Sequence, residues 1–167
     1  NQAPHGHVDA GQVDIQANGI CWVMGSLGKE DYQMPGVFDV TRPGYEDPIT
    51  APAAPGRYHL YKLRTEGKSA VVINAEGTPD IRPEQDEYGV AKVDKIVSKP
   101  QGGYSIVDLY GTYHRDAESY RRGIRFSENR RAFTIQDEIV TKKNTAKVHW
   151  SVNTPARINI SGDGKTA

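Results

Sequence analysis

The feature that most constrains the fold of this chain is a series of short segments in which apolar and polar residues alternate. Helical periodicity is nearly absent. In residues 12–17 two apolar side chains, Val13 and Ile15, alternate with the polar residues Gln12, Asp14 and Gln16. A period of two places the apolar side chains on one face of an extended strand. Gly, Pro, Asn and Asp gather between such segments, as they do in turns. The chain is therefore expected to be all-β.

The segments follow one another at intervals of about ten residues, which favours an antiparallel β-sandwich over a parallel sheet with helices. Strands are expected at 12–17, 20–24, 58–64, 70–74, 91–98, 103–109, 119–126, 132–140, 146–152 and 156–161. Asn18-Gly19 is the strongest two-residue hairpin signal, and turns are also expected at 101–103 and 127–130. Residues 115–119 alone suggest a helical turn, and long irregular loops are expected at 25–57 and 75–89.

Charge and hydropathy exclude two classes of partner. The formal net charge is zero, so no overall basic field attracts nucleic acid. No apolar run approaches the roughly 20 residues that a membrane-spanning helix needs. The arginines at 121, 122, 125, 130 and 131 are interrupted by acidic residues, and a solvated face is the expected interpretation.

The segment His5-Gly6-His7-Val8-Asp9 carries two imidazoles and a carboxylate at alternate positions. In an extended backbone all three side chains point to one side. Such a cluster can bind a metal or transfer protons. The alternative is an exposed polar loop, in which Asp9 caps the turn at Ala10-Gly11.

A second candidate lies at Tyr113, His114 and Arg115. Tyrosine can stack on a sugar ring, and arginine can hold a carboxylate with two parallel hydrogen bonds. These residues are the candidate substrate-binding group. The alternative is an ordinary loop at the end of a strand.

The order of several segments resembles the β-sandwich of the heparinase II/III-like polysaccharide lyases. Residues 5–11 (HGHVDAG) are similar to the His-Gly-His-x-Asp-x-Gly signature that opens that domain. Residues 64–74 (RTEGKSAVVIN) resemble the family's Arg-x-Glu-Gly-His-Asn-Thr-Leu-Val-Ile-Asn segment. Similar segments occur at 19–24, 31–39, 120–126 and 136–139. The resemblance covers most of residues 1–167.

The resemblance implies a supersandwich-like domain, truncated at both ends, that packs against a preceding α/α-toroid domain. Members of the family cleave uronic-acid-containing polysaccharides, such as glycosaminoglycans, by β-elimination. The domain would not be active alone, because further catalytic residues belong to the toroid. The alternative is a non-catalytic carbohydrate-binding or structural module derived from such a lyase.

The resemblance also assigns individual residues. His5 matches the histidine at the catalytic groove, and His7 matches one ligand of a structural zinc site. The other two ligand positions fall on Gly25 or Ser26 and on Lys68, so the ligand set is incomplete. No cofactor is therefore expected, and the Lys68 ammonium is a candidate to supply the positive charge of the metal. This hypothesis requires Lys68 to lie close to His7.

Partners and localisation also follow from the resemblance alone. The expected partners are an acidic polysaccharide and the toroid domain of the same chain. The expected location is outside the cell, in the periplasm or in the cell envelope.

Overall fold

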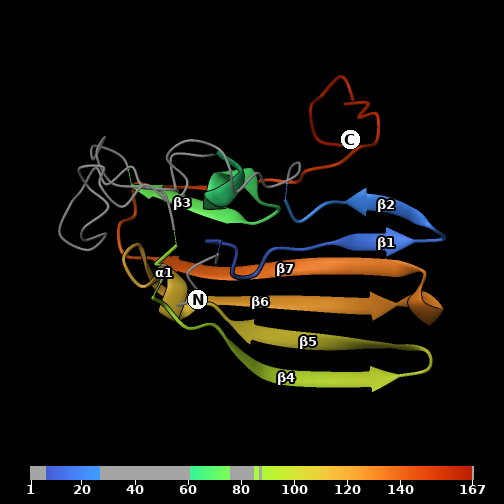
Figure 1. Ribbon diagram of the computed structural model, residues 1–167, viewed down its shortest axis with the longest axis horizontal. Helices are drawn as coiled ribbons and strands as arrows, with labels where there is room; N and C mark the ends of the chain where they lie inside the picture. Colours follow the sequence, from blue (N-terminus) through green and yellow to red (C-terminus); the bar gives the residue numbers. More distant parts are fainter. Residues whose placement is uncertain (1–6, 27–60, 76–84, 87, 167) are drawn as a thin grey trace, which may run out of the picture.

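The computed structural model describes residues 7–26, 61–75, 85–86 and 88–166, and antiparallel strands dominate them (Figure 1). Strand β1 (Ile15–Ala17) pairs with β2 (Ile20–Val23), and β3 (Val71–Ala75) pairs with β8 (Ala146–Trp150). A four-stranded sheet runs in the order β4 (Lys92–Lys99), β5 (Gly102–Asp108), β6 (Ala117–Ser127) and β7 (Ala132–Thr141). The all-β prediction is confirmed, and the sandwich arrangement stays a prediction.

In the described part of the chain the helical elements are single turns. They are α1 (Tyr110–Tyr113) and the 3-10 turns η2 (Tyr61–Leu63), η3 (Thr65–Gly67) and η4 (Glu128–Arg130). In Figure 1, α1 lies at the end of the four-stranded sheet where β5 ends and β6 begins. Among the described residues no helix is long and apolar enough to cross a membrane.

The Asn18-Gly19 hairpin forms as predicted between β1 and β2. Both residues have positive φ values, 53° for Asn18 and 75° for Gly19. A two-residue turn with positive φ at both positions matches the twist of the strands that it joins. The local sequence is therefore sufficient to fix this turn.

The four-stranded sheet has one face that turns toward the core and one that turns away from it. Tyr120 and Arg122 of β6 point to the core side and are buried. Arg121 and Arg125, at the alternate positions of the same strand, are exposed. The period-two pattern of β6 thus decides which of its arginines meet solvent.

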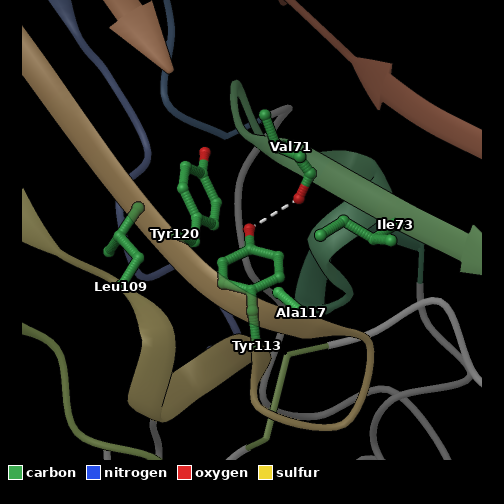
Figure 2. Close-up of a cluster of buried hydrophobic side chains, with 6 residues drawn as sticks. All are labelled: Val71, Ile73, Leu109, Tyr113, Ala117 and Tyr120. Carbon is green, nitrogen blue, oxygen red and sulfur yellow. Dashed lines mark hydrogen bonds between the residues drawn. The ribbon is translucent and has the colours of Figure 1, made fainter. Parts of the chain in front are cut away.

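The core joins β3 to β6 and α1 (Figure 2). Its buried side chains are Val71, Ile73, Leu109, Tyr113, Ala117 and Tyr120. The Tyr113 and Tyr120 rings meet edge to face, with centroids 4.8 Å apart. The Tyr113 hydroxyl donates a hydrogen bond of 2.6 Å to the Val71 carbonyl oxygen, which links α1 to β3.

Arg122 corrects the expectation of a fully solvated arginine face. Its side chain is 1% exposed and forms a fork with Asp137, through bonds of 2.7 Å from Nε and 2.8 Å from Nη2. Its Nη1 also donates to the Gly11 carbonyl oxygen. Burial alone disfavours the charged guanidinium, but the hydrogen bonds with Asp137 raise the pKa of Arg122 overall. Arg122 therefore links the end of residues 5–11, the N-terminal motif, to the four-stranded sheet.

Three predicted elements differ from the structure. Residues 61–63 of the expected strand 58–64 form a 3-10 turn, and residues 58–60 lie outside the described part of the chain. The helical turn lies at 110–113 rather than 115–119, because Asp108 Oδ1 accepts a 2.8 Å bond from the Tyr110 backbone N–H and the Leu109 carbonyl accepts from Thr112.

Residues 156–161 are the third difference, since they form no strand. Ile158 and Ile160 are 58% and 71% exposed. A strand needs a neighbour for its backbone hydrogen bonds, and no described segment pairs with this one. Alternation alone was therefore insufficient to predict a strand here.

The ends of the other predicted strands agree with the structure to within two residues, with one exception. They are β1 to β8 in the order given, with β1 starting three residues later than predicted and β8 ending two residues earlier.

Candidate functional site

Lys68 joins two parts of the chain at the centre of the candidate site. It follows η3, is fully buried, and forms an isolated antiparallel bridge with Ser26. Its Nζ lies 2.6 Å from His7 Nδ1 and 3.2 Å from Ser26 Oγ. The positions that the resemblance assigns to one metal site, 7, 26 and 68, are therefore within hydrogen-bond distance of one another through Lys68.

A charged Lys68 would fix the tautomer of the His7 ring. An ammonium group has three donors and no acceptor, so a charged Lys68 donates to His7 Nδ1. The remaining ring proton then lies on Nε2. With one ring nitrogen accepting a hydrogen bond and the other protonated, this imidazole has no lone pair left for a metal.

These residues do not fit a zinc ion. An ammonium repels a divalent cation, and Ser26 brings a hydroxyl where the resemblance expects a carboxylate. Gly25 brings no ligand either: its backbone N–H donates a 2.7 Å bond to Asp14 Oδ1. Among the described residues no group of three His, Cys, Asp or Glu side chains could hold a metal.

Buried polar groups hold the N-terminal motif in place. The Ala10 backbone and the Gln85 amide exchange two hydrogen bonds of 2.7 Å each, and Gln85 is 3% exposed. The Val8 carbonyl oxygen accepts a 3.0 Å bond from Thr65 Oγ1. Each of these contacts spans a long sequence separation, so the motif is ordered by tertiary packing.

Gly11 ends the motif in a conformation that suits glycine. Its φ is +77°, and a Cβ there would lie 2.7 Å from Leu109 Cδ1. The turn that it completes is closed by the Gln12 N–H, which donates to the Asp9 carbonyl at 3.0 Å. Asp9 thus takes part in the predicted turn through its backbone.

A pocket of about 200 Å³ lies beside the motif. Its acidic and basic side chains are His7, Asp9 and Asp86. The rest of its wall is formed by Val8, Ala10, Gln85, Gly89, Ala91 and Thr112. One imidazole and two carboxylates therefore surround a space that is large enough for a few atoms of a ligand.

Asp86 connects this pocket to two of the candidate substrate-binding residues. Its Oδ2 lies 3.5 Å from His114 Nε2 and 3.5 Å from Arg115 Nη2. His114 Nδ1 lies 3.1 Å from the Gly111 carbonyl, to which it donates. With Nδ1 occupied in this way, His114 donates to Asp86 only when its ring is doubly protonated.

Tyr113 takes a different position from the one expected. Its ring is 4% exposed, and its hydroxyl donates to Val71 and accepts a 2.8 Å bond from Gln85 Nε2. Burial raises the pKa of the Tyr113 phenol, so the group stays protonated. Tyr113 belongs to the core, and only His114 and Arg115 of the three candidates reach solvent.

Gln85 and Asp86 were missed by sequence reasoning. They lie within the acidic, proline-containing loop predicted at 75–89, where nothing marks them out. Their role becomes visible only when the loop packs against Ala10 and Thr112, to whose carbonyl Asp86 N–H donates at 2.7 Å. His5 lies outside the described residues.

Comparison with protein-family models and with curated protein sequences finds no match for this chain.

Proposed function

We propose that this chain is the β-sandwich part of a polysaccharide lyase that cleaves uronic-acid-containing polysaccharides by β-elimination. The residues of the site are His5, His7, Lys68 and the His114–Arg115 pair. A helical toroid domain of the same protein would form the other wall of the substrate groove. The enzyme would act outside the cell, in the periplasm or in the cell envelope.

One observation carries the proposal. Lys68 Nζ and His7 Nδ1 are 2.6 Å apart, although 61 positions separate the two residues in the sequence. The resemblance to the lyase family requires these two positions to share one site. A chance likeness of two short motifs gives no reason for such a contact.

The replacement of a metal by an ammonium is physically reasonable in this setting. Both supply fixed positive charge to a buried group of polar side chains. Lys68 also makes directed hydrogen bonds to His7 and to Ser26 Oγ. A buried charge of this kind is retained only when such partners satisfy it. In the proposed enzyme, Lys68 is a positioning residue that orients His7.

The proposed reaction places three demands on the groove. Positive charge must neutralise the uronate carboxylate, a base must remove the C5 proton, and an acid must protonate the leaving oxygen. The electron pair of the C5–H bond forms the C4–C5 double bond, while the C4–O bond breaks. Arg115 is the described cation suited to the carboxylate, and His5 is assigned to proton transfer by the resemblance.

A non-catalytic carbohydrate-binding module is the second candidate function. The observation that favours it is the same Lys68, because a lineage that has lost its metal ligands can also have lost its reaction. In such a module the pocket beside His7 would bind sugar without cleaving it.

The two functions are separated by a substrate panel. The full-length protein that carries this chain is incubated with uronate polymers that differ in sugar and sulfation, and unsaturated uronate is followed by its ultraviolet absorbance. Product from at least one polymer supports the lyase. Binding of a polymer without product supports the module, and neither binding nor product contradicts both.

A further inference from the structure

The face of the four-stranded sheet that turns away from the core contains a groove with the features of a second saccharide site. The groove has a volume of about 860 Å³ and is lined by residues of β4, β5, β6 and β7; Figure 1 shows that these strands lie side by side. The side chains that give it its chemistry are Tyr104, Arg121, Arg125, Thr134, Gln136 and Glu138. It lies on the opposite face of the sheet from Tyr120 and Arg122, which face the core.

The strand register explains why the groove is hollow at its centre. Gly123 of β6 pairs with Ile106 on one side and Gln136 on the other. A Cβ at Gly123 would meet only the Gln136 carbonyl oxygen, at 3.8 Å. Arg121 and Arg125 are two positions away along the same strand and point to the same side. The side chains of Arg121 and Arg125 therefore lie on either side of Gly123, where the backbone carries no side chain.

The two arginines differ in whether a carboxylate of the protein already pairs with them. Arg121 Nη2 lies 3.4 Å from Asp94 Oδ2, in an exposed ion pair. Arg125 is exposed, and no described carboxylate pairs with it. Its planar guanidinium can therefore bind a ligand carboxylate with two parallel hydrogen bonds.

Tyr104 provides a ring next to that guanidinium. It pairs directly with Arg125 across β5 and β6, and Lys95 Nζ lies 5.6 Å from its ring centroid. An aromatic ring beside an available cation suits a ligand with an apolar ring face and an attached anion. A sugar acid has both features.

The charge balance restricts the ligand further. Three cations and two acids line the groove: Lys99, Arg121, Arg125, Glu128 and Glu138. The two glutamates weaken the attraction that the three cations would exert on a densely charged polyanion such as nucleic acid. Thr134 and Gln136 add polar groups that suit hydroxyls. A chain with about one carboxylate per sugar or fewer fits this pattern.

We propose that this groove binds a short uronate-containing oligosaccharide, with the carboxylate on Arg125 and the sugar ring against Tyr104. The choice of a uronate as the occupant rests on the proposed function, whereas the groove and its charge do not. This second site would hold the polymer at a distance from the pocket beside His7.

Calorimetric titration of the 167-residue chain with tetragalacturonate tests the proposal. Wild type is expected to bind it, and to bind the uncharged galactose tetramer at least about tenfold more weakly. Arg125→Gln should weaken uronate binding by about tenfold, the loss expected for a two-bond contact with a charged group. Arg157→Gln, an exposed arginine outside the groove, is the matched control and should bind like wild type.

Gly123→Val provides a second test, because it fills the groove without strain. The site is in an open part of a strand, where valine is favourable. The variant should keep its unfolding transition and lose at least tenfold in affinity. Binding that is unchanged in both Arg125→Gln and Gly123→Val, or no uronate binding by wild type, would overturn the proposal.

These outcomes are separate from those that decide the proposed function. A His5→Ala variant should still bind tetragalacturonate in the groove. Loss of lyase activity with retained binding leaves this inference intact, and loss of binding in Arg125→Gln with retained product formation leaves the lyase proposal intact.

Discussion

Lys68 Nζ lies 2.6 Å from His7 Nδ1, so two side chains that are 61 positions apart in the sequence share a hydrogen bond at positions that the proposed lyase relationship assigns to a metal site. Because Lys68 is fully buried, solvent cannot replace His7 as the partner of its ammonium group. Introducing metal ligands at these positions should therefore create a metal site.

Introducing two ligands beside His7 should create a zinc site. The double variant Ser26→Asp/Lys68→His places a carboxylate and an imidazole beside His7, which gives three protein ligands for zinc. Calorimetry should show one tightly bound zinc per chain for this variant and none for wild type. Adding His7→Ala to the double variant should weaken the site by about tenfold or more. Zinc binding that is unaffected by His7→Ala would show that the metal lies elsewhere.

Removing the buried arginine should be strongly destabilising. Arg122→Met keeps a similar volume but removes the donor of the Gly11 carbonyl and two of the donors of Asp137, which keeps the 3.0 Å bond from the Tyr120 hydroxyl. We expect a loss of about 3–5 kcal/mol in the free energy of unfolding, measured with urea. Arg121→Met is the control, since its ion pair with Asp94 is exposed and contributes about 0–1 kcal/mol. Equal losses in the two variants would contradict the assigned role of Arg122.

The two glycines with similar φ values separate backbone strain from steric overlap. Gly19 has a φ of +75° and open space where a Cβ would lie, whereas a Cβ at Gly11 would be 2.7 Å from Leu109 Cδ1. Gly19→Ala should cost about 1–2 kcal/mol from the left-handed backbone alone. Gly11→Ala should cost about 1–3 kcal/mol more, because it also overpacks the core. Chemical denaturation of both variants checks the difference, and equal costs would refute the close contact.

Glu66 should make stability depend on pH. Burial raises the pKa of this carboxyl above 4.5, against the opposing charge of Arg64. A raised pKa in the folded state contributes stability that is fully present below the unfolded value and is lost as the pH rises through the folded one. The unfolding free energy of wild type minus that of Glu66→Gln should therefore fall as the pH rises from about 4 toward 7.

The control for this titration is Glu118→Gln, because Glu118 is exposed on β6. Its difference from wild type should change less over the same pH range. A wild-type advantage over Glu66→Gln that grows with pH would contradict the assigned environment of Glu66.

Local patterns in the sequence predicted most of the sheet, because strand alternation and the Asn18-Gly19 turn are properties of neighbouring residues. They did not distinguish Arg122 from Arg121, since burial of one arginine depends on Asp137 in the next strand. The exposed segment 156–161 shows the opposite case, in which alternation is present and no described strand pairs with it.

The candidate site was predicted only in part for the same reason. His7 and Lys68 were brought together by resemblance to a family, which is long-range information. Asp86 and Gln85 contact the motif through tertiary packing, and no pattern in their own segment marks that contact. Tyr113 was predicted to bind substrate together with His114 and Arg115, but its position on α1 turns its ring into the core.

The rate of unsaturated uronate formation by the full-length protein tests the central claim most directly. On the polymer that the panel identifies, we predict that wild type and the exposed-histidine control His149→Ala form product at similar rates. His5→Ala should be slower by about 100-fold or more, the contribution expected of a positioned acid or base. Equal rates for His5→Ala and His149→Ala, or no product from any uronate polymer with wild type, would contradict the account.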